Sequence, residues 1–434
     1  MILLSKIEHN LGVRKILDYK NRKPGVKILD FDIAVIDFTS SLLNVCIGSI
    51  NKAGQVQSKV NVGVECNGIR KGVIYDMDTV VNALSETIKN IKNDYGIGIK
   101  SAFVNVPCYM CQVDQHFVTE NVFNKEVDKD VLHNIKNKLL SVPKKDNSVV
   151  IDIALTKFIL DNNMEVRDPL GKFANQLSAS SNIVSLNSEY FTVLNNLFDR
   201  VGLQMDGIVM NTLSGLSLLP FSDSERSNVI MINISWEITD ITVCSFGKIV
   251  YIDTIFAGAK NIVKDVSIGL NISVEDAERF LHHYPVADPL YIKSDLENTV
   301  RGINGENITF KLSDMVTFTR DRILDIYEIC AQKLADHDIP LAEDYKVCIY
   351  GADIEKYTGY LDQVQQVFGL KYKKIPYALF EVEDICYGTG CGMIRYISHH
   401  PLLKRESLLN VKKETKHQKK ESILKKVMGL LKID

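Results

Sequence analysis

The sequence predicts an α/β protein of two lobes, each a mixed sheet flanked by helices, with a small α/β subdomain inserted in the first lobe. Two segments carry this prediction, residues 31–65 and residues 228–255. Each reads as a strand ending in Asp or Asn, small polar residues, and two further strands. Two copies of one hairpin about 200 residues apart indicate a duplicated architecture. The cleft between the lobes is where a ligand would bind.

Between the two hairpins, helical and strand periodicities alternate. The expected elements are a helix over 74–96, a strand over 101–113, a helix over 125–141, a strand over 148–160 and a Pro-Leu-Gly turn at 169–171 feeding another strand. A helix follows, with Asn187 or Ser188 as its N-cap. In the second lobe, Ser273 fits an N-cap with Asp276 three residues later, an acidic variant of the capping box, and a long helix starts at Leu312.

These patterns divide the chain into seven segments. They are an N-terminal extension (1–30), the first part of the first lobe (31–120), the inserted subdomain (121–187), a return to the first lobe with the crossover (188–225), the second lobe (226–398), a basic linker (399–421) and a C-terminal amphipathic helix (422–434). The extension has its own helical spacing of apolar residues, at Leu4, Ile7, Leu11, Ile16 and Leu17.

Composition is that of a globular protein, with 46% apolar and 24% charged residues in 434. Residues 401–434 hold ten basic and four acidic side chains, so a tail of net charge +6 follows a body of −9. Such a tail favours an anionic partner. The nine cysteines are mostly single, and Cys108-x-x-Cys111 has no second pair at zinc spacing, so we expect buried thiols and no metal. No transmembrane stretch or signal peptide is recognisable, which predicts an intracellular protein.

The segment Val229–Val243 has the outline of a phosphate-binding hairpin with unusual residues in its turn. Glycines normally form such a turn, because they allow positive φ and leave room for phosphate oxygens. Here the turn is Ser235, Trp236 and Glu237. Trp236 would fill the space and Glu237 would repel a triphosphate, by about 4 kcal/mol at 4 Å and a surface-like dielectric.

The order of these elements resembles the actin/Hsp70/hexokinase-type fold and, within it, the FtsA proteins of bacterial cell division. The resemblance covers roughly residues 35–398 and the last dozen residues. It is carried by "KGVIYDMDTVVNALSETI", by the inserted module with its "DPLGKF" turn, by "EYFTVLNNLFDRVGLQMDGIVMNTLSGLSLL" and by the amphipathic C-terminus. The similarity implies an actin-like fold.

The resemblance also implies a nucleotide cleft, and three motifs of that cleft are altered here. The D-x-G-T-[TS]-K motif keeps Asp37, Ser40 and Ser41, but Thr39 replaces Gly and Leu42 replaces Lys. The D-x-G-G-G-T-x-D motif reads from Asn233 to Asp240, with an amide for the first carboxylate. The complete remnant set is Asp37, Thr39, Ser40, Ser41, Asn233, Ser235, Trp236, Asp240, Glu275, Glu278 and Gly351.

Glu275 and Glu278 stand where the family's E-x-A-E helix passes the nucleoside, and Gly351 is what remains of the glycine turn under the adenine. We therefore expect a decayed site with no catalytic residue and no cofactor. Weak binding of ATP with Mg²⁺ is the alternative, with Asp37 and Asp240 holding the water shell of the metal.

The tail "ESILKKVMGLLKID" predicts a membrane-binding helix that Ser422 can cap. Apolar residues follow helical spacing and lysines lie beside them: Ile423, Leu424, Lys425, Lys426, Val427, Met428, Leu430, Leu431 and Lys432. Burial of each apolar side chain at a lipid interface contributes up to ~1.5–3 kcal/mol. A helix packed on the body or on a partner protein is the alternative. Nucleic acid is not expected, because no aromatic residue follows Tyr396.

The resemblance implies an adaptor that tethers FtsZ polymers to the inner face of the cytoplasmic membrane at the division site. Its partners would be the FtsZ C-terminal peptide, an anionic membrane surface and other copies of the chain in protofilaments. Arg320 and Arg322 are candidates for an acidic peptide, or are solvated surface. Two other functions remain open: an actin-like ATPase filament protein and a PilM-type pilus-assembly scaffold.

Overall fold

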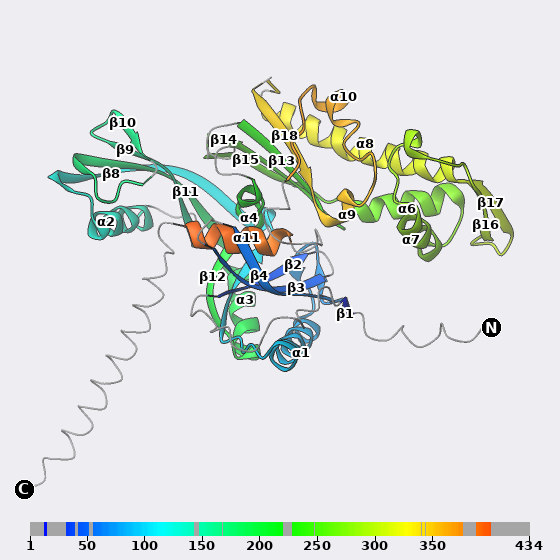
Figure 1. Cartoon of the computed structure of the whole chain (residues 1–434), viewed down its shortest axis with the longest axis horizontal. Coiled ribbons are helices and arrows are strands. Elements are labelled where there is room, and N and C mark those ends of the chain that lie inside the picture. Colours follow the sequence, from blue (N-terminus) through cyan, green and yellow to red (C-terminus); the bar gives the residue numbers. More distant parts are fainter. Residues whose placement is uncertain are drawn as a thin grey trace, which may run out of the picture.

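The first lobe is built on a six-stranded sheet in the order β1-β4-β3-β2-β7-β12 (Figure 1). The computed structural model describes residues 13–14, 32–39, 42–51, 55–142, 147–166, 168–219, 228–246, 248–339, 341–342, 344–375 and 388–400. The strands are β1 (Val13–Arg14), β2 (Ile33–Thr39), β3 (Leu42–Ile50), β4 (Val56–Glu65), β7 (Ser101–Val106) and β12 (Gln204–Met210). A short hairpin of β5 (Ile69–Arg70) and β6 (Val73–Ile74) lies beside them.

Strand β2 pairs antiparallel with β3 and parallel with β7, so the lobe begins as a meander and continues by crossovers. Helices cover both faces, with α1 and α3 on one side and α4 and α11 on the other (Figure 1). Their bounds are α1 (Met77–Tyr95), α3 (Ser188–Val201), α4 (Asn211–Leu218) and α11 (Gly388–His399). The helix that the spacing of apolar residues predicts in the N-terminal extension is wrong at Val13–Arg14, because these two residues form a strand that pairs with β4. An unpaired strand edge readily accepts another strand.

Capping side chains fix where the first-lobe helices begin. Asp76 accepts the N–H groups of Asp78 and Thr79 at the start of α1. Asn187 does the same at the start of α3, which confirms it as the predicted N-cap. Such a cap stabilises a helix by about 1 kcal/mol because it satisfies backbone donors that have no partner within the helix.

The inserted subdomain is a four-stranded sheet in the order β10-β9-β11-β8, with α2 packed against it. Its elements are β8 (Cys111–Glu126), α2 (Lys129–Leu140), β9 (Ser148–Leu160), β10 (Met164–Val166) and β11 (Phe173–Asn187). The predicted boundary at residue 121 falls inside β8. The single strand expected over 101–113 is also wrong, because the chain turns at Pro107 through the 3₁₀ turn η1 (Cys108–Met110). Proline has no N–H to continue a sheet ladder.

A buried carboxylate fastens the insertion to α11. Asp152 on β9 accepts a 2.6 Å hydrogen bond from Tyr396 Oη and lies 3.1 Å from His400 Nε2. Asp152 and His400 are both almost fully buried. A buried carboxylate is costly unless it is hydrogen-bonded, so this contact holds the subdomain and the helix in one arrangement.

The second lobe repeats the pairing pattern of the first. Its sheet has the order β15-β14-β13-β18, with β13 antiparallel to β14 and parallel to β18. The strands are β13 (Asn228–Ile234), β14 (Thr239–Ser245), β15 (Lys248–Ile255) and β18 (Tyr345–Tyr350). Strand β13 therefore occupies the place that β2 has in the first lobe. This repeat confirms the predicted two-lobe fold with duplicated mixed sheets.

Helices and one small hairpin complete the second lobe. They are α6 (Ala259–Leu270), α7 (Val274–His283), η2 (Pro289–Tyr291), β16 (Glu297–Arg301), β17 (Asn307–Lys311), α8 (Leu312–Asp336), α9 (Ala352–Glu355) and α10 (Val364–Phe368). Ser273 caps α7 by accepting the N–H of Asp276, as predicted. In the part of the chain that the structure describes, no helix is long and apolar enough to span a membrane.

The hydrophobic core of the first lobe extends onto one face of the second sheet. Val229, Met231 and Cys348 of the second sheet belong to the buried cluster of the first lobe. Tyr350, at the end of β18, packs directly on Gly215 of α4, where an added Cβ would lie 2.0 Å from Tyr350 Oη. A glycine inside a helix is therefore required by close packing between the lobes.

Gly215→Ala should destabilise the protein by about 1–3 kcal/mol, although alanine is the better helix former. The rigid, buried Tyr350 ring must move to admit the methyl group. Tyr350→Phe in the same chain should recover part of the loss, measured as the melting temperature of single and double variants. Additive effects of the two changes would contradict this packing.

Candidate functional site

The turn between β13 and β14 is closed by its own hydrogen bonds. The N–H and the Oγ of Ser235 both donate to the carbonyl of Ile238, each at 3.0 Å. Asn233, at the end of β13, pairs with Asp240 across the hairpin and with Tyr350 of β18. The hairpin that the sequence indicated is therefore present, in a tight form.

The carbonyl oxygens of this turn cap helix α6. Ser235 O accepts the N–H of Ala259 at 3.0 Å, and Trp236 O accepts that of Lys260 at 2.8 Å. Gly258 precedes the helix, and a Cβ there would lie 2.2 Å from Ser235 O. N–H groups at a helix N-terminus are the donors that bind phosphates in many proteins. Here the turn itself satisfies two of them.

Trp236 extends from the turn onto the second lobe. Its half-buried side chain packs against the second-lobe core. Lys356, directly after α9, lies 6.0 Å from the Trp236 ring centroid and 5.4 Å from that of Tyr357. The indole thus occupies the side of the turn next to α9, and Lys356 approaches its face as a cation–π partner.

Asp37, the acid of the first motif, lies on β2 and is 1% exposed. Its Oδ1 accepts a 2.7 Å hydrogen bond from Asn105 Nδ2, and its Oδ2 has no hydrogen-bond partner among the described residues. Burial raises the pKa of the Asp37 carboxyl to about 7, although hydrogen bonds from Asn105 and Asn44 lower it. The group therefore changes charge near neutral pH.

Asp240, the acid of the second motif, is also buried but is fully hydrogen-bonded. One oxygen accepts from Thr254 Oγ1 at 2.6 Å and Cys108 Sγ at 3.3 Å, and the other accepts from Asn211 Nδ2 at 2.5 Å. Burial raises its pKa, against the lowering effect of these three donors. Cys108 and Asn211 come from the first lobe, so Asp240 joins the lobes.

The other remnant residues are spread around the hairpin. Thr39 Oγ1 accepts from Asn44 Nδ2 at 3.3 Å, while Ser40 and Ser41 lie outside the described residues. Gly351 has φ +129°, and a Cβ there would lie 2.3 Å from Ile234 O and 3.0 Å from Asn233 Oδ1. It is therefore a close-approach glycine against the hairpin.

The two glutamates of α7 are exposed, and one of them lies near α9. Burial raises the pKa of Asp353, Lys356 lowers it and Glu278 raises it further, which places Glu278 within electrostatic range of α9. No contact joins Glu275 to the hairpin within the described ranges. The fold thus assembles Asn233, Ser235, Trp236, Asp240 and Gly351, with Glu278 at the edge.

The partners of Glu237, and with them Lys71, Tyr109 and Phe256, were not predicted from the sequence. Glu237 forms a 2.9 Å ion pair with Lys260 and accepts the backbone N–H of Lys71 at 2.9 Å. Tyr109 Oη donates to Lys71 O at 3.1 Å, and Lys71 Nζ lies 4.2 Å from the ring centroid of Phe256. The signal in the sequence was Gly72, because glycine readily adopts positive φ in turns.

The predicted partner-binding arginines are both on α8. Arg322 pairs with Asp265 of α6 at 2.5 Å and with Asp325 at 3.4 Å, so it fastens two helices together. Arg320 is half-exposed and contacts the neighbouring Asp321. The predicted membrane helix, including Ile423–Lys432, lies outside the described residues.

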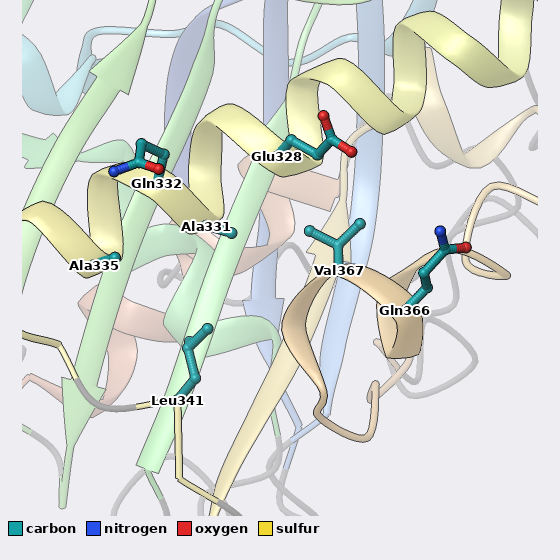
Figure 2. Close-up of a pocket in the computed structure, with 7 residues that line it drawn as sticks. All are labelled: Glu328, Ala331, Gln332, Ala335, Leu341, Gln366 and Val367. Atoms are coloured by element: carbon teal, nitrogen blue, oxygen red, sulfur yellow. The ribbon is translucent and has the colours of Figure 1, made fainter.

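One hollow of about 440 Å³ lies between the C-terminal half of α8 and α10 (Figure 2). It is lined by Glu328, Ala331, Gln332, Ala335, Leu341, Gln366 and Val367. This lining holds one carboxylate and no basic side chain, so it is unsuited to a phosphate. Over the described part of the chain, no three His, Cys, Asp or Glu side chains are placed to hold a metal ion.

Asp37→Asn should remove a pH dependence of stability. The folded pKa of about 7 lies above the ordinary value of 3.8, so the folded state holds the proton between these values and wild-type stability falls as pH rises through that window. From pH 5 to pH 8 the variant should gain about 2–3 kcal/mol relative to wild type. Chemical unfolding at both pH values measures this difference, and parallel pH profiles would contradict it.

Comparison with known proteins agrees with this architecture. Residues 111–185 match the model of the SHS2 domain inserted in FtsA. The cell division protein FtsA of Bacillus subtilis (strain 168) is 25% identical over 345 residues, which are 78% of this chain and 77% of the relative. The cell division protein FtsA of Pseudomonas aeruginosa is 20% identical over 379 residues, covering 84% and 88% of the two chains.

Solved structures share the fold at low sequence identity. The PilM–PilN type IV pilus biogenesis complex matches 84% of this chain and 98% of its own with a TM-score of 0.54 and 12% identity. MreB5 of Spiroplasma citri bound to ADP matches 87% and 99% with a TM-score of 0.51 and 11% identity. The duplicated sheets, the SHS2 insertion and the FtsA relatives lead to one conclusion: the chain has the actin-type fold and is similar to the FtsA proteins of cell division.

Proposed function

We propose that this protein is a membrane adaptor of cell division that tethers FtsZ polymers to the inner face of the cytoplasmic membrane without using a nucleotide. The supporting observation is the similarity to cell division proteins named FtsA along 78% of the chain, together with the inserted SHS2 domain. Fold alone would be a weak reason, because one fold carries many functions. Self-association into protofilaments belongs to the same proposal.

The membrane end of the adaptor would be the amphipathic segment Ile423–Lys432, which the structure does not describe. Its apolar stripe and flanking lysines suit the interface of an anionic bilayer, where each lysine contributes roughly 1 kcal/mol. This segment follows α11, which the first-lobe core and the insertion hold in place. Force on the tail would therefore reach the body through α11.

The FtsZ end would be on the second lobe. We place the acidic C-terminal peptide of FtsZ near α8, with Arg320 as the more available arginine. Arg322 is committed to Asp265, so its loss should loosen α8 from α6 more than it weakens an external contact.

Independence from nucleotide is supported by the geometry of the hairpin. The residues present do not fit a triphosphate with Mg²⁺. Carbonyls of the turn cap α6, the Trp236 ring covers the side of the turn towards α9, and the Glu237 carboxylate accepts from Lys71 and Lys260. Phosphate oxygens need hydrogen-bond donors, and here the N–H of Lys71 and Nζ of Lys260 already donate to the carboxylate of Glu237.

An ATP-binding filament protein is the second candidate, favoured by the two motif acids Asp37 and Asp240, which are both present and buried. A pilus-assembly scaffold is the third. This chain resembles the PilM–PilN complex in fold only, whereas its inserted subdomain matches the SHS2 domain of FtsA.

The full chain should sediment with anionic liposomes and carry purified FtsZ with it. A chain truncated after Glu421 should stay in the supernatant, because it lacks the apolar stripe. Val427→Glu should release the full chain similarly, while Leu408→Glu in the linker adds the same charge outside the stripe and should leave binding intact. Equal sedimentation of all four chains would refute the anchor.

Millimolar Mg-ATP should leave the melting temperature of the full chain unchanged, because the hairpin offers ATP no site. A ligand that binds only the folded state would stabilise it by RT ln(1 + [L]/Kd). Differential scanning fluorimetry with and without Mg-ATP measures this. A rise that Asp37→Ala abolishes would instead establish the ATP-binding alternative.

A further inference from the structure

The carboxylate of Glu237 bridges the two lobes. Its Oε2 accepts the backbone N–H of Lys71, which belongs to the first lobe, at 2.9 Å. Its Oε1 accepts from Nζ of Lys260, near the start of α6 in the second lobe, also at 2.9 Å. The Glu237 side chain is 17% exposed, so solvent screens these contacts only in part.

Positive potential surrounds this carboxylate. Burial raises the pKa of Glu237. Hydrogen bonds from Lys260 and Lys71 and the charges of Lys260 and Arg70 outweigh this effect, so the pKa is below its ordinary value. The N-terminus of α6 adds the positive end of a helix dipole nearby. Such surroundings stabilise an anion, whether it is a carboxylate or a phosphate.

The first-lobe side of the bridge is held in a strained conformation. Lys71 has φ +52° and Gly72 has φ +76°, so two successive residues are left-handed. A non-glycine residue there costs energy and persists only where its surroundings fix it. Three contacts fix Lys71: its N–H with Glu237, its carbonyl with Tyr109, and its ammonium with the ring of Phe256. Glu237 and Phe256 belong to the second lobe, so two of these contacts join the two lobes.

The position of Glu237 in the hairpin indicates what this bridge does. It stands in the tight turn between β13 and β14, where a phosphate-binding hairpin has glycine. We propose that Glu237 is a built-in anion that latches the lobes together, occupying with its own carboxylate the place of an external oxyanion. The inference goes beyond tethering, because it concerns how the lobes stay closed whichever partner binds.

The latch predicts chemical rescue. In Glu237→Ala, Lys260 Nζ and the Lys71 N–H lose their shared acceptor and become a two-donor site for a small oxyanion. Hydrogen exchange of the peptide containing Lys71 should become about tenfold faster or more, because a charge-assisted hydrogen bond closes that segment. Inorganic phosphate or acetate at 100 mM, against chloride at equal ionic strength, should restore much of the protection.

Matched variants separate the latch from a general packing role. Glu86→Ala removes an exposed glutamate from α1 and should change neither exchange nor anion response. Glu237→Gln keeps the side-chain volume and one acceptor, so it should open the segment less, and anions should not restore it because the amide fills the site. Lys260→Met should open it as well, again without rescue.

The full chain without liposomes or FtsZ is used throughout, so failure of the tethering function leaves this test unaffected. Local opening at Lys71 in Glu237→Ala with rescue by phosphate or acetate supports the latch. Unchanged exchange in that variant overturns it. A uniform increase over both lobes without anion rescue also overturns it, since Glu237 would then be ordinary core. Should Glu237→Ala fail to fold, Lys260→Met decides: faster exchange confined to the segment of Lys71 supports the latch, and unchanged or uniformly faster exchange overturns it.

Discussion

The burial of Asp240 between the lobes is the constraint on which the rest of this structure depends. A carboxylate removed from water must be hydrogen-bonded, and no cation contacts Asp240 within the described residues. Two of its three donors, Cys108 and Asn211, come from the first lobe. They reach Asp240 only while the lobes are closed, so the polar contact and the packing of Tyr350 on Gly215 require each other.

The hairpin of β13 and β14 is part of the joint between the lobes. The turn carbonyls cap α6, Trp236 covers the side towards α9, and Glu237 reaches Lys71 on the opposite lobe. The contacts of Trp236 and Glu237 are made by side chains, which glycine at those positions would lack. In an adaptor that works without nucleotide, such contacts would hold a single closed state in place of a ligand-dependent equilibrium.

The inserted subdomain and α11 form a second rigid connection. Asp152 takes Tyr396 and His400 as partners, and α11 also packs on the first sheet, where Gly390 allows it to approach Cys46 closely. The last described helix before the basic tail is thus held by two separate parts of the first lobe (Figure 1). In the tether proposed above, load that reaches α11 would be shared between the sheet and the insertion.

The sequence by itself determined the elements and their duplication, because apolar periodicity and capping residues such as Asn187 and Ser273 act over a few residues. It also placed Asp37, Asn233 and Asp240 at strand ends. Tertiary structure decided what these residues do. The break at Pro107, the burial that raises the pKa of Asp37, and the bridge from Glu237 to Lys71 join or separate groups far apart in the chain. Desolvation and cross-lobe hydrogen bonds depend on distances in space, and local sequence patterns carry no information on those distances.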